Sequence, residues 1–230
     1  MKDIQPLEKT LSIGFNNKNL LRQAVVHRSY LNENPSFELD HNERLEFLGD
    51  AVLELVVTEH LYTDYPNPEG ELTNWRAALV NAHNLASVAR TLDIEDYLYL
   101  SRGESKDKNT KARNYILANA MEALIGAIYL DQGYQIIKEF IERHILSKLP
   151  YIIEHKLYLD SKTKFQEASQ EKMGITPTYQ VLRENGPDHN KEFAVGVYIG
   201  NEQVAEGLGT SKQEAETAAA EAGLKAKEWD

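Results

Sequence analysis

The first two thirds of the chain carry apolar residues at three- and four-residue spacing. This period is typical of helices that bury one face, and it recurs over residues 20–26, 45–61, 72–92 and 116–145. The connections between these runs contain helix-breaking or strongly charged sequence. No long alternation of apolar and polar residues occurs before Lys156. The pattern therefore predicts an all-α domain.

The pattern changes after about residue 156. Three runs typical of strands are separated by turn sequences rich in glycine and asparagine; they cover residues 178–183, 192–199 and 203–207. A helical segment stands on either side of them, so the order is α-β-β-β-α. This order predicts a second, small domain, and we expect residues 150–156 to form the linker before it.

Both helices of the second domain have sequence signals at their N-termini. In the first helix, predicted over 161–172, Thr163 and Gln166 have the spacing of a capping box. In the last helix, Ser211 and Glu214 have the same spacing. We therefore expect Thr163 and Ser211 to be the N-cap residues of these helices.

Composition narrows the class of protein. The 230 residues are 42% hydrophobic and 27% charged, which excludes collagen-like and wholly disordered chains. The absence of cysteine excludes a disulfide framework, a thiolate zinc site and a cysteine nucleophile. The net charge of −11, from 25 Lys+Arg against 36 Asp+Glu, argues by itself against a nucleic-acid partner.

The sequence predicts no targeting or membrane segment. Its start, MKDIQPLEKTLSIGF, lacks the apolar core of a signal peptide. The longest apolar-rich stretch, 115–130, is interrupted by Asn119 and Glu122 and is too short to span a bilayer. We therefore expect a cytoplasmic protein with no membrane partner.

One predicted helix carries like charges on an otherwise apolar background. Glu43, Glu46 and Asp50 fall within an arc of roughly 60° on a helix of about 100° per residue. Carboxylates at this spacing repel one another, and a divalent cation would turn that cost into affinity. An exposed acidic stripe explains this helix, taken alone, equally well.

A second predicted helix, over 115–130, is apolar on nearly all sides and should be buried. It nevertheless places Asn119 and Glu122 on one face. A buried carboxylate without a partner is costly, so two helices whose acids face each other would form an oxygen-lined site suited to magnesium or manganese. The alternative is a core ion pair of Glu122 with an arginine: Arg44, Arg76 or Arg113.

Six segments together resemble the ribonuclease III family. Four resemble its endonuclease domain: NERLEFLGDAVL (42–53), HRSYLNEN (27–34), PEGELTNWRAALVNAHNLA (68–86) and ILANAMEALIGAIYLD (116–131). Two resemble a double-stranded-RNA-binding domain: GPDHNKEF (186–193) and TSKQEAETAAA (210–220). The resemblance covers nearly the whole chain and implies an all-α endonuclease domain at 1–153 and an α-β-β-β-α RNA-binding domain at 158–228.

The resemblance implies a magnesium-dependent homodimer that hydrolyses double-stranded RNA, with manganese as a substitute for magnesium. The products would carry 5′-phosphate and 3′-hydroxyl ends, and the substrates would be ribosomal and other structured RNA precursors. An acidic, helical cation-binding protein also fits the composition, but it would leave the second domain unexplained.

The family's site residues carry over to matching positions. Asp50 and Glu122 match its catalytic acids, and Phe47 matches a dimer-contact position. The matched metal positions are Glu46, Asp50, Asn119 and Glu122, with Glu43 and Glu69 as outer acids.

The chain departs from the family at Asn119, where aspartate is usual. An asparagine can still ligate magnesium through its amide oxygen, but the cluster loses one negative charge, so cation affinity should fall. We expect activity with a higher magnesium requirement. The alternative is a protein that binds double-stranded RNA and cleaves it weakly or not at all.

The second domain is acidic, with a net charge of −5 over residues 158–230. Duplex RNA is recognised largely by shape, so a few well-placed donors suffice. Lys212 at the start of the last helix can hold a phosphate. The residues that match the family's RNA contacts are Gln166, Glu167, Pro187, Asp188, His189, Ser211 and Lys212. Because Gln213 stands where a second basic residue is common, we expect weaker, salt-sensitive binding.

The densest basic segment precedes the helix that holds Glu122. It contains Arg102, Lys106, Lys108, Lys111 and Arg113. Contact with an RNA backbone beside the active site and a merely solvated loop are equally good interpretations of it.

Overall fold

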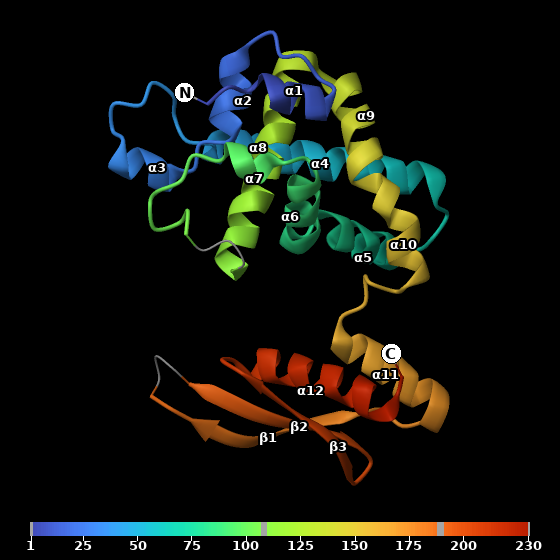
Figure 1. Cartoon of the computed structure of the whole chain (residues 1–230). Coiled ribbons are helices and arrows are strands. Elements are labelled where there is room, and N and C mark those ends of the chain that lie inside the picture. The colour runs from blue at the N-terminus through green and yellow to red at the C-terminus, as the bar shows by residue number, and fades with distance from the viewer. Residues whose placement is uncertain (1, 107–109, 188–190, 230) are drawn as a thin grey trace. The chain divides into compact units, whose positions relative to one another are not determined.

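The computed structural model describes residues 2–106, 110–187 and 191–229. The chain forms two compact units, Met1–Tyr158 and Leu159–Asp230 (Figure 1). The first unit is helical: α1 Gln5–Leu11, α2 Lys18–Ala24, α3 Arg28–Glu33, α4 Glu43–Asp64, α5 Glu69–Val80, α6 Ala82–Thr91, α7 Ile94–Tyr97, α8 Lys111–Gln132, α9 Tyr134–His144, η1 Leu146–Lys148 and α10 Leu149–Glu154. The second has the order α11 Ser161–Met173, β1 Thr178–Asn185, β2 Glu192–Ile199, β3 Glu202–Gly209 and α12 Lys212–Lys227. Both predicted fold classes are confirmed.

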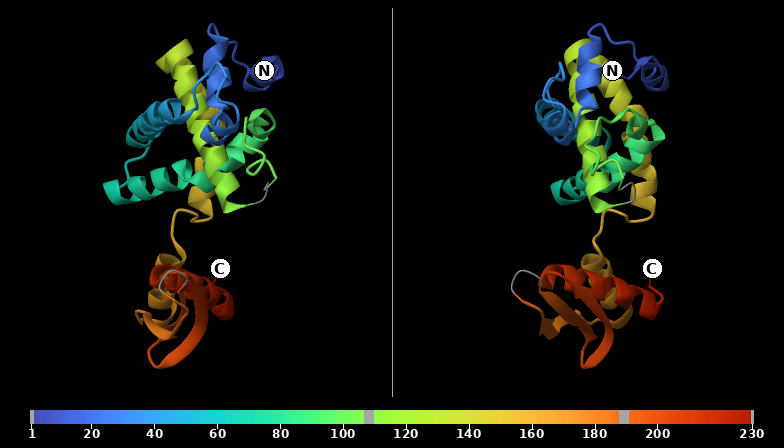
Figure 2. Two further views of the ribbon diagram at one scale, coloured as in Figure 1. Left: turned by 90° about the vertical axis from the view of Figure 1, so that its left-hand side faces the viewer. Right: turned by 60° about the vertical axis from the view of Figure 1, so that its left-hand side comes forward.

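The helical unit is built around α8. Its residues from Ile116 to Ile128 are buried apart from Asn119 and Glu122, as the apolar sequence predicted. Helices α2, α4, α6 and α9 all pack against α8 (Figures 1 and 2). Side chains such as Leu53, Leu117 and Met121 are fully enclosed between these helices. Asn119 and Glu122 are therefore held by a rigid, closely packed support.

Two stretches of continuous helical spacing are each divided into two helices. The run 72–92 breaks at Asn81, whose extended backbone ends α5 and whose side chain accepts a 2.9 Å hydrogen bond from the N–H of Asn84 to begin α6. The run 116–145 breaks at Gly133, which has a φ of +80°. The apolar spacing stays in phase across both breaks, so periodicity alone could not reveal them.

The second unit packs two helices on one face of an antiparallel sheet of order β1-β2-β3 (Figure 2). Val195, Val197 and Ile199 point from β2 into a core that Phe165 of α11 completes. β3 lies so close to α12 that a Cβ atom on Gly207 would be only 2.1 Å from the backbone nitrogen of Ala219. Only glycine fits at this position. All three strands extend beyond or match the predicted runs.

Helix caps differ in part from the prediction. The N-cap of α11 is Asp160 rather than Thr163: its carboxylate accepts hydrogen bonds from the N–H groups of Lys162 (2.9 Å) and Thr163 (3.0 Å). The helix begins at the next residue, Ser161, so Thr163 lies inside its first turn. The segment expected to be the linker, 150–156, is mostly helix α10, which ends at Glu154.

The cap of α12 follows the prediction at Ser211. The Ser211 hydroxyl accepts a 3.2 Å hydrogen bond from the N–H of Glu214. The reciprocal bond shifts by one residue, because the Glu214 carboxylate accepts from the N–H of Thr210 at 3.0 Å. Among the described residues, no helix combines the length and the apolar character needed to cross a membrane.

Candidate active site

Helices α4 and α8 cross at two glycines. A Cβ atom on Gly49 would lie 1.7 Å from the backbone oxygen of Glu122, and a Cβ atom on Gly126 would lie 2.3 Å from the backbone oxygen of Leu45. Atoms cannot approach so closely, so any side chain at either position would push the helices apart. The crossing therefore depends on glycine at both positions.

This crossing brings together four predicted site residues. Glu46 and Asp50 lie within one turn of the glycine on α4, and Glu122 lies one turn before the glycine on α8. Asn119 precedes Glu122 by three residues, so both lie on the face of α8 that meets α4. The structure thus places side chains from two distant parts of the sequence at one point.

The electrostatics of the cluster show how closely its acids interact. Burial raises the pKa of Glu122 to about 8, with the negative charges of Asp50 and Glu46 acting in the same direction. Burial also raises the pKa of Glu46, with Glu43 and Asp50 adding to the rise and the Asn119 amide opposing it. The carboxylates therefore destabilise one another's charged forms, and a cation among them would relieve this.

The alternative of a core ion pair does not hold. Within the described part of the chain, Glu122 forms no ion pair. Arg76 donates a hydrogen bond to the Thr58 hydroxyl (2.9 Å), and Arg113 donates one to the backbone oxygen of Glu104 (2.6 Å). Arg44 is exposed. Glu122 is thus a partly buried acid whose nearest charges have the same sign.

The donor set fits a hard divalent cation. Glu46, Asp50 and Glu122 offer carboxylate oxygens, and Asn119 offers an amide oxygen, which are the ligands that magnesium and manganese prefer. Among the residues that the structure describes, no three aspartate, glutamate or histidine side chains are grouped closely enough to enclose an ion as they stand. An ion would therefore have to draw these side chains together.

The two outer acids occupy different places. Glu43 lies at the edge of the cluster, 3.3 Å from Arg28 and 3.7 Å from His41. Glu69 does not join the cluster of its own chain. It lines a groove together with residues near the C-terminal end of α4. The first of these, Thr58, follows Asp50 by eight residues, which is about 12 Å along the helix axis.

One face of α4 is apolar and exposed. Phe47 and Tyr62 are each 82% exposed, and Leu55 lies between them at 57%. The groove that Glu69 lines is next to this face, and its other lining residues are Thr58, Leu61, Tyr62, Asn67, Leu72, Thr73 and Arg76. Single exposed apolar residues are ordinary, but a line of three beside a groove is typical of a contact surface.

The predicted RNA-binding residues of the second unit lie on its surface where the structure describes them. Gln166 and Glu167 are exposed on α11, Pro187 is exposed after β1, and Ser211 and Lys212 are exposed at the start of α12. Asp188 and His189 lie outside the described residues. The Lys212 ammonium is 3.1 Å from Glu184 and 5.7 Å from the centre of the Phe193 ring, so it already has an ion-pair partner in the folded chain.

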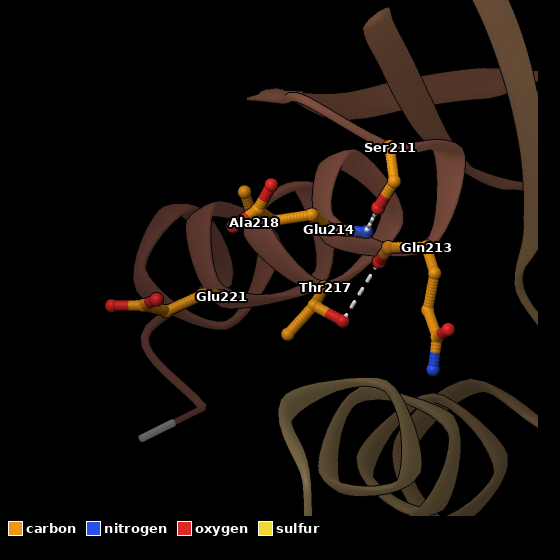
Figure 3. Close-up of a pocket in the computed structure, with 6 residues that line it drawn as sticks. All are labelled: Ser211, Gln213, Glu214, Thr217, Ala218 and Glu221. Atoms are coloured by element: carbon orange, nitrogen blue, oxygen red, sulfur yellow. Dashed lines mark hydrogen bonds between the residues drawn. The ribbon is translucent and has the colours of Figure 1, made fainter. Parts of the chain in front are cut away.

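The exposed side of α12 is polar along its length. Figure 3 shows Ser211 accepting from the Glu214 N–H, and the Thr217 hydroxyl donating to the backbone oxygen of Gln213 at 3.0 Å. Glu221 continues the same groove. Lys212 is the only basic residue in the first turn of this helix, so the positive charge there comes from that one side chain.

The basic segment divides into exposed and buried members. Arg102, Lys106 and Lys111 are exposed, and Lys108 lies outside the described residues. Arg113, in contrast, is buried: its side chain is only 3% exposed and lies 3.7 Å from Glu95. Arg113 therefore belongs to the packing of α8 and not to a phosphate-binding surface.

Comparison with known proteins matches both units. Residues 17–149 match a family model described as Ribonuclease-III-like, and residues 161–227 match one described as Double-stranded RNA binding motif. "Ribonuclease 3" of Borreliella afzelii is 45% identical over 96% of this chain and 89% of its own. The chain belongs to the ribonuclease III family. "Ribonuclease 3" of Natranaerobius thermophilus is 46% identical over 95% of this chain and 94% of its own.

Solved structures agree with this. The nuclease domain of Campylobacter jejuni ribonuclease III, described as showing structural flexibility in a region involved in dimer formation, aligns with a TM-score of 0.57 and 40% identity. The alignment covers 64% of this chain and 99% of that one. As a member of the ribonuclease III family, the chain is an endoribonuclease that acts on double-stranded RNA, and its family is generally metal-dependent.

The residues that sequence reasoning missed are Gly49 and Gly126. Each is a glycine inside an apolar helix, where it costs about 1 kcal/mol of helix stability relative to alanine. A costly glycine within one turn of an acidic residue is a signal that the sequence does carry. It could have identified Gly49 and Gly126 as the point where the two helices cross.

Proposed function

We propose that the protein hydrolyses phosphodiester bonds of double-stranded RNA with magnesium, leaving 5′-phosphate and 3′-hydroxyl ends. The observation that supports this most strongly is the cluster at the α4–α8 crossing, where burial and the charges of Asp50 and Glu46 raise the pKa of Glu122 and no described basic group neutralises it. Manganese would substitute for magnesium, since it takes the same oxygen ligands.

Each residue of the cluster has a role in this proposal. Asp50 and Glu122 would be the principal ligands of the ion, and Glu46 and Asn119 would complete its oxygen shell. A bound divalent ion would supply Lewis-acid chemistry, by lowering the pKa of water and neutralising charge on the phosphate. The packing around α8 keeps Glu122 in position, while Asp50 is exposed to solvent.

Substrate binding would involve the second unit. The first turn of α12 offers Lys212, the capping Ser211 and the helix N-terminus to a phosphate. The exposed Gln166, Glu167 and Pro187, with Asp188 and His189, would contact the minor grooves on either side. Ribosomal and other structured RNA precursors in the cytoplasm are the substrates we expect.

We also propose that two copies pair through α4. A two-fold contact uses the same surface on both copies. With the two-fold axis perpendicular to α4, the two α4 helices would run antiparallel. Leu55 lies eight residues after Phe47 and seven before Tyr62. A two-fold axis near Leu55 would therefore place Phe47 opposite Tyr62 of the partner subunit, at the groove that Glu69 lines.

This pairing gives Glu69 a place in the site. Glu69 is far from the acids of its own chain, but the antiparallel arrangement brings Glu69 of the partner subunit toward the Phe47 end of α4, where Glu43 and Glu46 lie. Leu55→Asp should then yield monomers in analytical ultracentrifugation. Monomers of the unaltered protein at micromolar concentration would argue against this pairing.

Asn119 sets the metal requirement in this proposal. It lowers the charge of the ligand set by one relative to aspartate, so the ion should bind more weakly. The alternative is a duplex-binding protein with little or no cleavage. It requires that Asn119 weakens binding of the ion so far that cleavage is largely lost.

Cleavage of a labelled RNA duplex over a magnesium titration distinguishes the two. We expect the unaltered chain to cleave, Asn119→Asp to shift the curve to lower magnesium, and Glu122→Gln to lose at least about 100-fold in rate while still binding duplex. If the unaltered chain binds duplex but never cleaves it, and Asn119→Asp restores cleavage, the alternative is correct.

A further inference from the structure

Helix α8 carries a stripe of polar residues that leads away from the acidic cluster. Lys111, Tyr115, Asn119 and Glu122 follow one another at spacings of four, four and three residues, so they lie along one face of the helix. Asn119 and Glu122 belong to the cluster. Tyr115 has no role in the folding or the chemistry described above, and Lys111 has been described only as an exposed member of the basic segment.

Tyr115 is an exposed aromatic residue at the start of a buried stretch of α8. It is 52% exposed, although the three residues that follow it, Ile116 to Ala118, are all buried. Lys111 is exposed as well and forms no ion pair among the described residues. A large aromatic ring and a cation without an ion pair among the described residues are thus accessible on the same face of α8 as Asn119 and Glu122.

The direction of the stripe indicates what it would contact. The phosphodiester to be cleaved must reach Glu122, and α8 is buried from Ala123 to Ile128. Along this helix, an RNA strand can therefore extend from the cluster only toward Tyr115. Tyr115 lies about 10 Å from Glu122 along the helix axis, within reach of the first few nucleotides beyond the cleaved bond.

We propose that Tyr115 and Lys111 bind the strand being cleaved, with the Tyr115 hydroxyl donating a hydrogen bond to its sugar–phosphate backbone and Lys111 contacting a phosphate. This inference rests on the proposed nuclease function. Duplex RNA displays its 2′-hydroxyls in a wide, shallow minor groove, which a tyrosine hydroxyl can reach. The ammonium group of Lys111 matches the charge of the adjoining phosphates.

The test is single-turnover cleavage of a duplex at saturating magnesium, with Tyr115→Phe, Tyr115→Ala and Lys111→Ala. Loss of one hydrogen bond corresponds to a change of about 2- to 12-fold. We expect Tyr115→Phe and Tyr115→Ala to slow cleavage by similar factors in that range. Tyr151→Phe, which alters another exposed tyrosine of the same unit, should cleave like the unaltered protein. Thermal unfolding should be unchanged in all four.

Substrates with single 2′-deoxy substitutions locate the contact. At one position near the cleaved bond, the deoxy substitution should lower the cleavage rate of the unaltered protein. The same substitution should not lower the cleavage rate of Tyr115→Phe any further. The proposal is overturned if Tyr115→Phe cleaves at the unaltered rate, if no position behaves in this way, or if Tyr115→Ala changes the oligomeric state instead. A failure of the nuclease function itself is distinct, because the unaltered protein would then not cleave at all.

Discussion

The two units hold their functional side chains in different ways. In the helical unit, the acids stand on two long helices that touch backbone to backbone at Gly49 and Gly126. In the second unit, Ser211 and Lys212 stand at an exposed helix start, supported by local hydrogen bonds and one ion pair. The first arrangement fixes positions through packing, whereas the second presents charge at a surface.

This difference fits the role that we propose for each unit. A metal site tolerates displacements of only a few tenths of an ångström, so its ligands need a rigid support. A phosphate backbone is an extended, regular charge, and a flexible lysine can follow it. Substitutions should therefore affect the two units through different quantities: folding and cleavage in the first, and affinity and its salt dependence in the second.

The largest effect should come from the helix crossing. Gly126→Ala places a Cβ atom 2.3 Å from a backbone oxygen, and backbone cannot give way as a side chain can. We expect a loss of about 3 kcal/mol in the free energy of unfolding of the helical unit. Gly207→Ala should cost the second unit a comparable amount, because its Cβ atom would lie 2.1 Å from the backbone of Ala219.

Hydrogen exchange of the full chain separates the two effects. Gly126→Ala should lower protection in Met1–Tyr158, and Gly207→Ala should lower it in Leu159–Asp230. Gly70→Ala is the matched control, since nothing lies within 4 Å of the added atom and alanine favours the helix. Unchanged protection in Gly126→Ala would show that the helices do not cross at this point.

A smaller effect should come from the charge of the cluster. The pKa of Glu122 is about 8 in the folded protein, above the usual glutamate value, so the folded state holds its proton more tightly than the unfolded state does. In the absence of divalent ions, the contribution of Glu122 to the free energy of unfolding is therefore greatest below about pH 4.5. It decreases as the pH rises to about 8. Glu46 acts in the same direction.

Glu122→Gln removes this dependence. With a chelator present, we expect the variant to gain about 1–2 kcal/mol on the unaltered protein between pH 5 and pH 8.5; solvent screening keeps this below the limit of about 1.4 kcal/mol per pKa unit. Urea unfolding at the two pH values measures the difference. Glu54→Gln, on the exposed side of α4, should show no such gain. A constant difference across this pH range would contradict the assignment.

The same contrast explains what the sequence could predict. Elements defined by burial were predictable, because apolar periodicity records which faces are covered. The acids on α4 and α8 were predictable as a group, because charge on an apolar helix is costly and needs a reason. The break at Asn81 was not, since the period continues in phase across it, whereas the helix predicted over 115–130 already ended before Gly133.

Other features depend on contacts between distant residues. The glycines at the crossing are recognisable only when the second helix is in place. The separation of Glu69 from its own cluster and the burial of Arg113 likewise follow from packing, not from local sequence. The N-cap of α11 was misplaced because Asp160 and Thr163 both have capping side chains, and only the backbone shows which one begins the helix.

The smallest effect should come from a single exposed lysine of the second unit. Lys212→Ala removes one exposed cation and should weaken duplex binding by about 3- to 10-fold near physiological salt. Because one phosphate contact is lost, the slope of log affinity against log salt should fall by about 1, and the unfolding temperature should stay the same.

Arg113→Ala is the matched comparison from the helical unit. It removes a cation that is buried beside Glu95, so it should lower stability and leave the salt slope unchanged. Filter binding at several salt concentrations measures both slopes. If Lys212→Ala left the slope unchanged as well, binding would depend on shape and neutral contacts alone, and the contrast between a packed site and a charged surface would not hold.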